Sequence, residues 1–231
     1  MTEHDDQNMQ STSEEPDRAT RLQAWRRGST GPLPVAVPVP VQHAWYRMTG
    51  GEWTSLALVP VDSHVRAAGL ARNFGQLAAQ EPQARILVVN ASLRGCWTPT
   101  DPRPAPPEEI WSFLAAASTT SAESSSLPFD YLDFVNLDRV EATRALASAQ
   151  TLLDAVMLKA AYRRCIFAVD DVMTQPEATP LVRAVDMAVL CVARGRSTLR
   201  AVRHALDLFG PSKIAGAVLL EPSTSASAAR D

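Results

Sequence analysis

Residues 187–220 read MAVLCVARGRSTLRAVRHALDLFGPSKIAGAVLL. The stretch opens and closes with apolar runs, 187–193 and 214–220, and between them, over 197–209, apolar residues recur at helical spacing. Strands that are apolar throughout are typical of a parallel sheet that is buried on both faces. The stretch therefore predicts a strand, a helix and a second strand, which is the repeating unit of an α/β fold.

The same alternation extends toward the N-terminus. Further strands are predicted at 53–59, 85–90, 129–135 and 165–169, and helices at 63–80, 108–117, 137–163 and 177–184. We therefore expect a single-domain α/β fold over 52–221, with a mostly parallel sheet and helices on both faces.

The segments that flank this domain have a different composition. Residues 1–31 are polar and acidic, and 222–231 are rich in Ser and Ala, so both are expected to be disordered tails. A Pro-rich spacer and a short helix are expected over 32–51, with 32–41 (PLPVAVPVPV) extended because each proline lacks an N–H. The serine-rich stretch 118–126 is expected to be a loop.

Composition excludes several classes of protein. The chain has 231 residues, with 22 Lys+Arg against 25 Asp+Glu and a net charge of −3, so it lacks the basic footprint of nucleic-acid or anionic-membrane binding. No apolar run is long enough to insert into a bilayer, and the acidic N-terminus is unlike a signal peptide, which predicts a cytoplasmic protein. The three cysteines and four histidines are scattered, so no metal site is expected.

The turn after the first strand is where a parallel sheet of this kind would bind a phosphate. Such a turn needs glycines that let backbone N–H groups cradle the anion, and a lysine. Residues 58–69 read LVPVDSHVRAAG, with no glycine before the last position, and the first lysine of the chain is Lys159. Arg66 does not replace a lysine at a tight phosphate site. We therefore expect an ordinary turn, with Asp62 or Ser63 capping the helix that follows.

Four segments follow one another in a characteristic order: LARNF at 70–74, ILVVNASLR at 86–94, YRRCIFAVD at 162–170 and LVRAVDMAVL at 181–190. Together they resemble the cytoplasmic domain of bacterial tyrosine kinases of the CpsD/Wzc type. These are P-loop proteins related to MinD and ParA that serve capsule and exopolysaccharide production. The resemblance implies that the expected α/β sheet over 52–221 is P-loop-NTPase-like and degenerate at its nucleotide site.

The resemblance implies a nucleotide site, and this chain departs from it at the positions that matter most. Asn90 and Ser92 stand where the family has the two acidic residues of its second Walker motif, and the Walker B aspartate falls on Ala168 or Asp170, depending on register. The C-terminal tyrosine cluster of the kinases is also missing. The degenerate site implied by the resemblance comprises His64, Arg66, Ala67, Ala68, Asn90 and Ser92.

Phosphoryl transfer depends on positioning and on metal and lysine charge, so these losses together predict a catalytically inactive relative without a bound cofactor. The leading hypothesis is an interaction or regulatory protein in exopolysaccharide or capsule biosynthesis and export. The resemblance implies as partner a membrane-anchored co-polymerase or chain-length protein, or a kinase homologue, which would bring the chain to the inner membrane; a homo-oligomer is a further expectation. Trp45, Tyr46 and Arg47 are candidate interface residues, with packing on the chain's own core as the alternative reading.

Two other readings stay open. The first is a divergent magnesium-dependent ATPase or kinase, or a phosphohydrolase, that binds ATP or magnesium through Asp62, Asp170 and Asp171; the alternative for the last two is capping of a turn. The second is a MinD/ParA-like spatial regulator. Arg194 and Arg196 could bind an anion or an acidic partner, or lie in a solvated loop.

Overall fold

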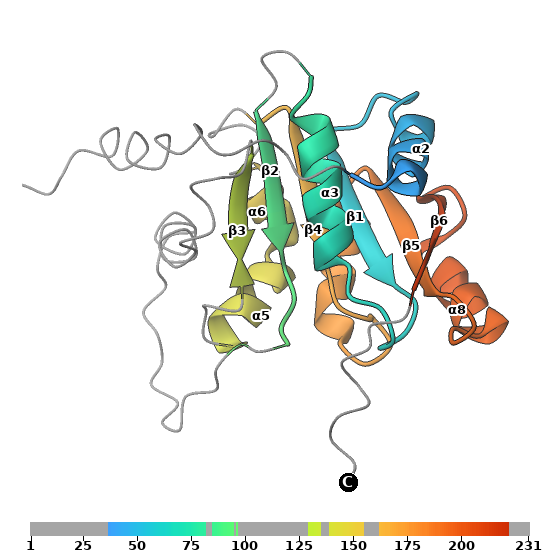
Figure 1. The fold of residues 1–231 in the computed structure, drawn as a ribbon. Coiled ribbons are helices and arrows are strands. Elements are labelled where there is room, and N and C mark those ends of the chain that lie inside the picture. Colours follow the sequence, from blue (N-terminus) through green and yellow to red (C-terminus); the bar gives the residue numbers. More distant parts are fainter. Residues whose placement is uncertain are drawn as a thin grey trace, which may run out of the picture.

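The computed structural model describes residues 37–81, 85–94, 96, 129–134, 139–154 and 162–221. Six parallel strands form one open sheet in the order β3-β2-β4-β1-β5-β6 (Figure 1). The strands are β1 Ser55–Pro60, β2 Ile86–Asn90, β3 Asp130–Asp133, β4 Arg164–Ala168, β5 Met187–Ala193 and β6 Ile214–Leu220. The predicted α/β class and the parallel sheet are confirmed.

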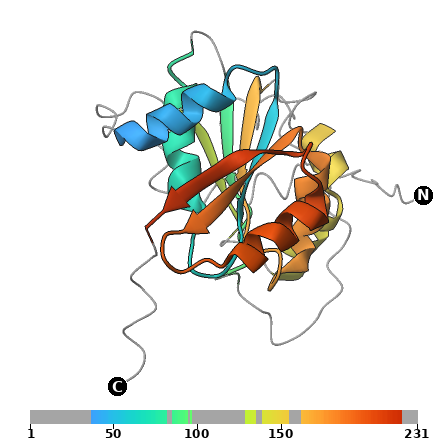
Figure 2. The same ribbon diagram turned by 90° about the vertical axis from the view of Figure 1, so that its right-hand side faces the viewer.

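Helices cover both faces of the sheet, as expected (Figures 1 and 2). One face carries α2 Val39–Met48 and α3 Ala68–Ala78. The other carries α5 Arg139–Ala147, α6 Ala149–Asp154, the short 3-10 helix η4 Pro176–Ala178, α7 Thr179–Ala184 and α8 Leu199–Phe209. In the part of the chain that the structure describes, no helix combines the length and the apolar character that crossing a bilayer requires.

The central strands are buried because their side chains alternate between two apolar layers. Every residue of β1 is buried; Ala57 and Val59 join the layer under α5 to α8, whereas Leu56 and Leu58 join the layer under α2 and α3. A continuous apolar sequence is therefore what a strand in the middle of this sheet requires.

Helix α3 packs unusually close to the sheet. A Cβ atom added at Gly75 would lie 2.5 Å from Val88 Cγ2 and 3.0 Å from two ring atoms of Phe129. Glycine at this position lets the helix axis approach β2 and the chain before β3.

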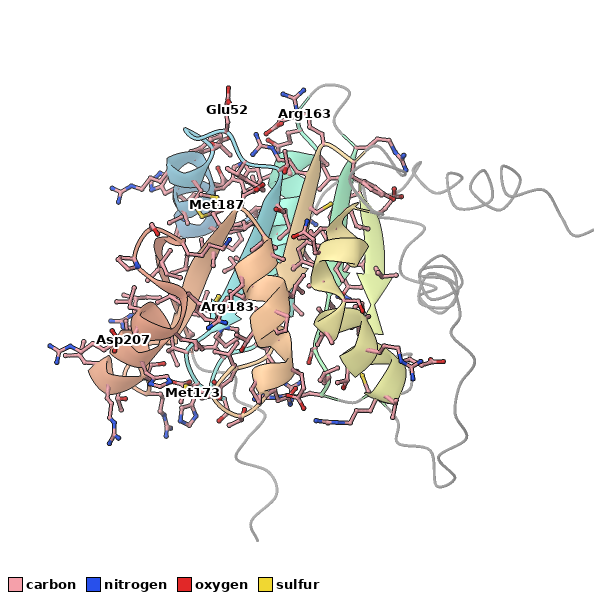
Figure 3. All side chains as sticks on the ribbon, turned by 180° about the vertical axis from the view of Figure 1, so that it is seen from behind. Glu52, Arg163, Met173, Arg183, Met187 and Asp207 are labelled. Carbon is pink, nitrogen blue, oxygen red and sulfur yellow. The ribbon has the colours of Figure 1, made fainter. Side chains whose placement is uncertain are left out.

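The amino ends of the strands are joined by polar contacts at the edge opposite to the predicted ligand edge. Arg164 stacks on the ring of Trp53, with 4.4 Å from guanidinium carbon to ring centroid, and makes two contacts with the Glu81 carboxylate, at 3.0 and 3.3 Å. Figure 3 shows Glu52 and Arg163 at this end of the sheet and Met173 at the other.

Two predicted segments differ from the structure around α2 and around α5 and α6. Helix α2 begins at Val39, inside the segment expected to be extended, because Pro38 precedes the helix and Pro40 lies in its first turn, where a missing N–H costs no helical hydrogen bond. The single helix predicted over 137–163 is divided at Ser148, a residue type that favours caps and turns over helix interiors. The helix predicted at 108–117, the loop at 118–126 and the two tails lie outside the described residues.

Candidate functional site

The carboxyl ends of β2, β4, β1 and β5 meet along one edge, and the loops that leave these strands carry nearly all the candidate residues. The loop after β4 lies between the loops after β2 and β1, because β4 is the strand between them. Contacts between these loops therefore decide what this edge can bind.

Asp170 links the loop after β4 to the loop after β2. Ser92 Oγ donates to Asp170 Oδ1 at 2.8 Å, and the backbone N–H of Leu93 donates to Oδ2 at 2.7 Å. The guanidinium of Arg94 adds an ion pair, with Nε 3.4 Å from Oδ1. Asp170 is only 7% exposed, so both carboxylate oxygens are engaged by donors of the chain itself and are shielded from solvent.

Asp171 points into its own turn instead of joining Asp170. Its carboxylate accepts hydrogen bonds from the backbone N–H of Met173 at 2.9 Å and from the hydroxyl of Thr174 at 3.1 Å. The side chain is 2% exposed and holds the turn that leads to η4. Asp171 therefore caps its own turn, which is the alternative given for it from the sequence.

The turn after β1 places Asp62 in a similar local role. Asp62 Oδ1 accepts the backbone N–H of His64 at 3.0 Å, and the side chains of His64 and Arg66 are exposed. Within the described ranges, which include Asp62, Asp170 and Asp171, no three His, Cys, Asp or Glu side chains lie close enough together to hold a metal ion. Asp62, Asp170 and Asp171 each accept hydrogen bonds from their own neighbouring loops.

Helix α3 begins five residues later than expected. Its first residue is Ala68, the preceding residue is Ala67, and no side chain caps its N-terminus, so the predicted cap by Asp62 or Ser63 is wrong. Asp62 instead closes the turn at His64, and the chain runs on to Ala67 before the helix starts.

Asn90 faces away from this turn, toward β3. Its Nδ2 donates to Asp133 Oδ1 at 2.9 Å, and the hydroxyl of Tyr131 donates to Oδ2 at 3.3 Å. The guanidinium of Arg72 lies over the Tyr131 ring, 4.6 Å from its centroid. Burial, with the Asp133 charge as the next cause, raises the pKa of Tyr131 to about 12. This phenol therefore stays protonated at neutral pH.

Sequence reasoning missed Arg94, Arg72 and Asp133 at this edge. Asp133 was within reach, because it lies inside the strand predicted over 129–135, and strand order would have placed it beside Asn90. The place of Cys96 was not foreseen: its thiol donates to the carbonyl of Phe134 at 3.1 Å, and burial raises its pKa. It is a thiol rather than a thiolate nucleophile at neutral pH.

The loop after β5 is shaped by its own hydrogen bonds. Gly195 has a φ of +67°, Ser197 Oγ accepts the backbone N–H of Ala193 at 2.7 Å, and Thr198 caps α8. The flanking side chains of Arg194 and Arg196 are exposed, and Arg194 pairs with the exposed Glu221 at 3.4 Å, so they lie in a solvated loop.

Comparison with known proteins identifies the architecture. The chain matches no known protein-family model, and no curated protein matches it. Among solved structures, the VpsO kinase domain superposes with a TM-score of 0.57 at 15% identity, covering 89% of this chain and 97% of that one. The kinase domain of the Escherichia coli tyrosine kinase Etk gives 0.56 at 16% identity (89% and 87% covered), and the BceF tyrosine kinase domain gives 0.54 at 15% (78% and 74%).

The chain has the fold of bacterial tyrosine kinase domains. The resemblance stated from the sequence is confirmed at the level of the fold. In this kinase-type fold, the residues between β1 and α3 do not fit a phosphate cradle, since Val61 to Ala67 include neither glycine nor lysine. The adjacent carboxylate of Asp170 is already bound by Ser92, Leu93 and Arg94.

The three candidate interface residues of α2 divide into one that is buried and two that are exposed. Trp45 is 2% exposed and packs on the rings of Trp53 and Phe74, with centroids 5.6 and 5.4 Å away. It is a core residue, as in the alternative reading, because its side chain faces the sheet. Tyr46, which is 61% exposed, and Arg47 lie on the outer side of α2.

Proposed function

We propose that the chain is a catalytically inactive relative of bacterial tyrosine kinases that acts as an interaction or regulatory protein in exopolysaccharide or capsule biosynthesis and export. The observation that carries the proposal is the state of Asp170. Its two oxygens accept Ser92 Oγ and the Leu93 N–H and face Arg94, at 7% exposure. A carboxylate held in this way joins two loops, which supports a structural role for Asp170 in place of metal binding.

The surrounding residues support the same proposal. Where phosphoryl transfer needs a phosphate cradle and a lysine, the chain has Val61 to Ala67, with an exposed His64 and Arg66. The proposed partner is a membrane-anchored co-polymerase or chain-length protein, or an active kinase homologue. On this proposal the protein is cytoplasmic and reaches the inner membrane through that partner.

A titration of the full chain with Mg-ATP and Mg-ADP by calorimetry tests the loss of nucleotide chemistry. We expect no binding heat and no rise in melting temperature up to millimolar nucleotide. Binding at micromolar affinity that is lost in Arg66→Ala, or any ATP turnover, would instead support the enzyme reading. Arg66 is exposed, so this variant leaves the core intact.

A pull-down from the native host tests the interaction role. We expect the full chain to recover a polysaccharide-assembly protein, and the double variant Tyr46→Ala, Arg47→Glu to recover less of it, because these two side chains are exposed on α2. Leu199→Ala is the matched control, since Leu199 is also largely exposed but lies on α8, across the sheet. Recovery of no such protein would contradict the proposal.

A further inference from the structure

Strand β6 leaves one edge of the sheet open. It is the last strand in the sheet order, and Figure 2 shows it along the outer side of the molecule. Residues 214–220 read IAGAVLL and carry no charge or proline, and Leu219 is 71% exposed. Monomeric proteins usually protect such an edge with lysine, proline or a covering element. Among the described residues, no strand pairs with its outer side.

The backbone of β6 is oriented for pairing on that side. The carbonyl of Leu220 accepts the N–H of Arg194 at 2.8 Å, so Leu220 and, by alternation, Val218 direct their hydrogen-bonding groups toward β5. The N–H and C=O groups of Ala217 and Leu219 therefore point outward. The register shift of the β5–β6 pair lies opposite Ala188 and Val189, which leaves the later part of β6 regular.

We infer that the open edge of β6 binds β6 of a second copy of this chain, antiparallel, about a two-fold axis at Ala217. A two-fold interface requires a surface that is complementary to itself, and β6 meets this requirement in its side chains and at its ends. Pairing about Ala217 places Leu219 opposite Ala215 of the partner subunit, so the one large exposed side chain meets a small one.

The charges at the two ends of β6 favour the same partner. Lys213 precedes the strand and Glu221 follows it, and pairing about Ala217 places Lys213 of each copy opposite Glu221 of the partner subunit. Within one copy, Lys213 donates to the carbonyl of Val185, and Glu221 pairs with Arg194 but remains 78% exposed. Parallel pairing would instead place like charges together. The interface joins the two sheets into one continuous sheet and satisfies the outward backbone groups of Ala217 in both copies, while Ala215 lies at the register shift of the β5–β6 pair.

Light scattering after size-exclusion chromatography of the full chain tests the inference. We expect a dimer mass at micromolar concentration and a monomer mass for Leu219→Lys, because a charge at an edge position opposes pairing. Leu199→Lys is the matched control: its side chain is 77% exposed on α8, and it should remain dimeric. A wild-type chain that stays monomeric would overturn the inference and leave the edge for a strand of another protein.

Cross-linking tests the register directly. In Ala217→Cys, the two new thiols would face each other across the axis, in a hydrogen-bonded antiparallel pair with Cα atoms about 5.5 Å apart, which suits a disulfide. We expect oxidation to give covalent dimers of this variant and not of the wild type, whose Cys165 and Cys191 are buried and whose half-buried Cys96 is hydrogen-bonded to the carbonyl of Phe134. Leu199→Cys, with its new thiol away from β6, is the control and should stay uncross-linked. A dimer that Leu219→Lys leaves intact and Ala217→Cys does not cross-link would use another surface and would refute the inference.

Discussion

Ser55 and Asp186 exchange hydrogen bonds across the amino ends of β1 and β5. Ser55 Oγ donates to Asp186 Oδ2 at 3.0 Å, and the backbone N–H of Asp186 donates to Ser55 Oγ at 2.9 Å. The same carboxylate oxygen also accepts the N–H of Ser55 and both the N–H and the hydroxyl of Thr54, at 2.7 to 2.9 Å. One aspartate thus fixes the start of two neighbouring strands.

The first prediction concerns Asp186 and pH. Burial raises its pKa, but the hydrogen bonds from Thr54 and Ser55 outweigh burial, and the pKa lies below the ordinary 3.8. The stabilisation by the carboxylate is therefore complete above the unfolded-state pKa and is lost as pH falls through the folded-state pKa. We expect Asp186→Asn to lower the free energy of unfolding at neutral pH by about 1 kcal/mol, allowing for solvent around an exposed carboxylate.

Urea unfolding of wild type and Asp186→Asn, at neutral pH and at acid pH below 3.8, measures this difference. The difference should shrink in acid, where the wild-type carboxyl is increasingly protonated. Asp207→Asn on the exposed surface of α8 is the control and should change stability little at either pH. A deficit that is the same at both pH values would contradict the assigned role.

The second prediction concerns Asp170. In Asp170→Asn, the new N–H₂ group would replace one of the two oxygens, and each oxygen now accepts from a donor. The N–H₂ would then face either the Leu93 N–H, or the Ser92 hydroxyl together with Arg94, in a nearly solvent-free site. We expect a loss of about 2 to 4 kcal/mol in the free energy of unfolding. Ser92→Ala removes one neutral donor and should cost about 1 kcal/mol. Equal stability of Asp170→Asn and wild type in urea would show that the carboxylate has no structural role.

The third prediction uses two glycines of α3. Gly75→Ala places a methyl group 2.5 Å from Val88 Cγ2, and we expect this overpacking to destabilise the protein by about 1 to 3 kcal/mol. Gly69 has no atom within 4 Å of a built Cβ, so Gly69→Ala should stabilise the helix by about 0.5 to 1 kcal/mol. Thermal unfolding should show a lower melting temperature for Gly75→Ala and a higher one for Gly69→Ala. A change in the same direction for both variants would rule out the close packing of α3 on the sheet.

The fourth prediction compares two neighbouring arginines at the start of β4. Arg164 stacks on Trp53 and makes two contacts with Glu81, whereas Arg163 is 69% exposed and only approaches Glu81 at 3.8 Å. Lysine keeps the charge but loses the planar fork and the stacking. We expect Arg164→Lys to cost about 1 to 2 kcal/mol in urea unfolding and Arg163→Lys less than about 0.5 kcal/mol. Equal effects would show that charge alone matters here.

The sequence predicted the buried strands well, because an apolar run bounded by polar residues has few other interpretations. The observed bounds of β5 and β6 are the predicted ones. Prediction failed at α2, where prolines suit both an extended spacer and a first helical turn, and at α3, whose start depends on the loop before it. Local pattern does not carry such distinctions.

The candidate site was predictable in its place but not in its contacts. The position of the site at the carboxyl edge follows from a parallel sheet. The absence of glycine and lysine between β1 and α3 can be read directly from the sequence. The bond between Ser92 and Asp170 spans 78 positions and depends on how two loops turn after β2 and β4. Periodicity describes each element separately, so it gives no information on which side chains of two loops meet.

The strand order has a consequence for synthesis of the chain. The central strand β1 pairs with β4 and β5, so Ser55 lies beside Cys165 and Leu56 beside Met187. A ribosome that has released only the first half of the chain exposes β1 with neither of its neighbours, and contacts so distant in sequence form slowly. The nascent apolar strand must then remain unpaired until the C-terminal half emerges, which makes this chain a natural client for chaperones that shield extended apolar segments.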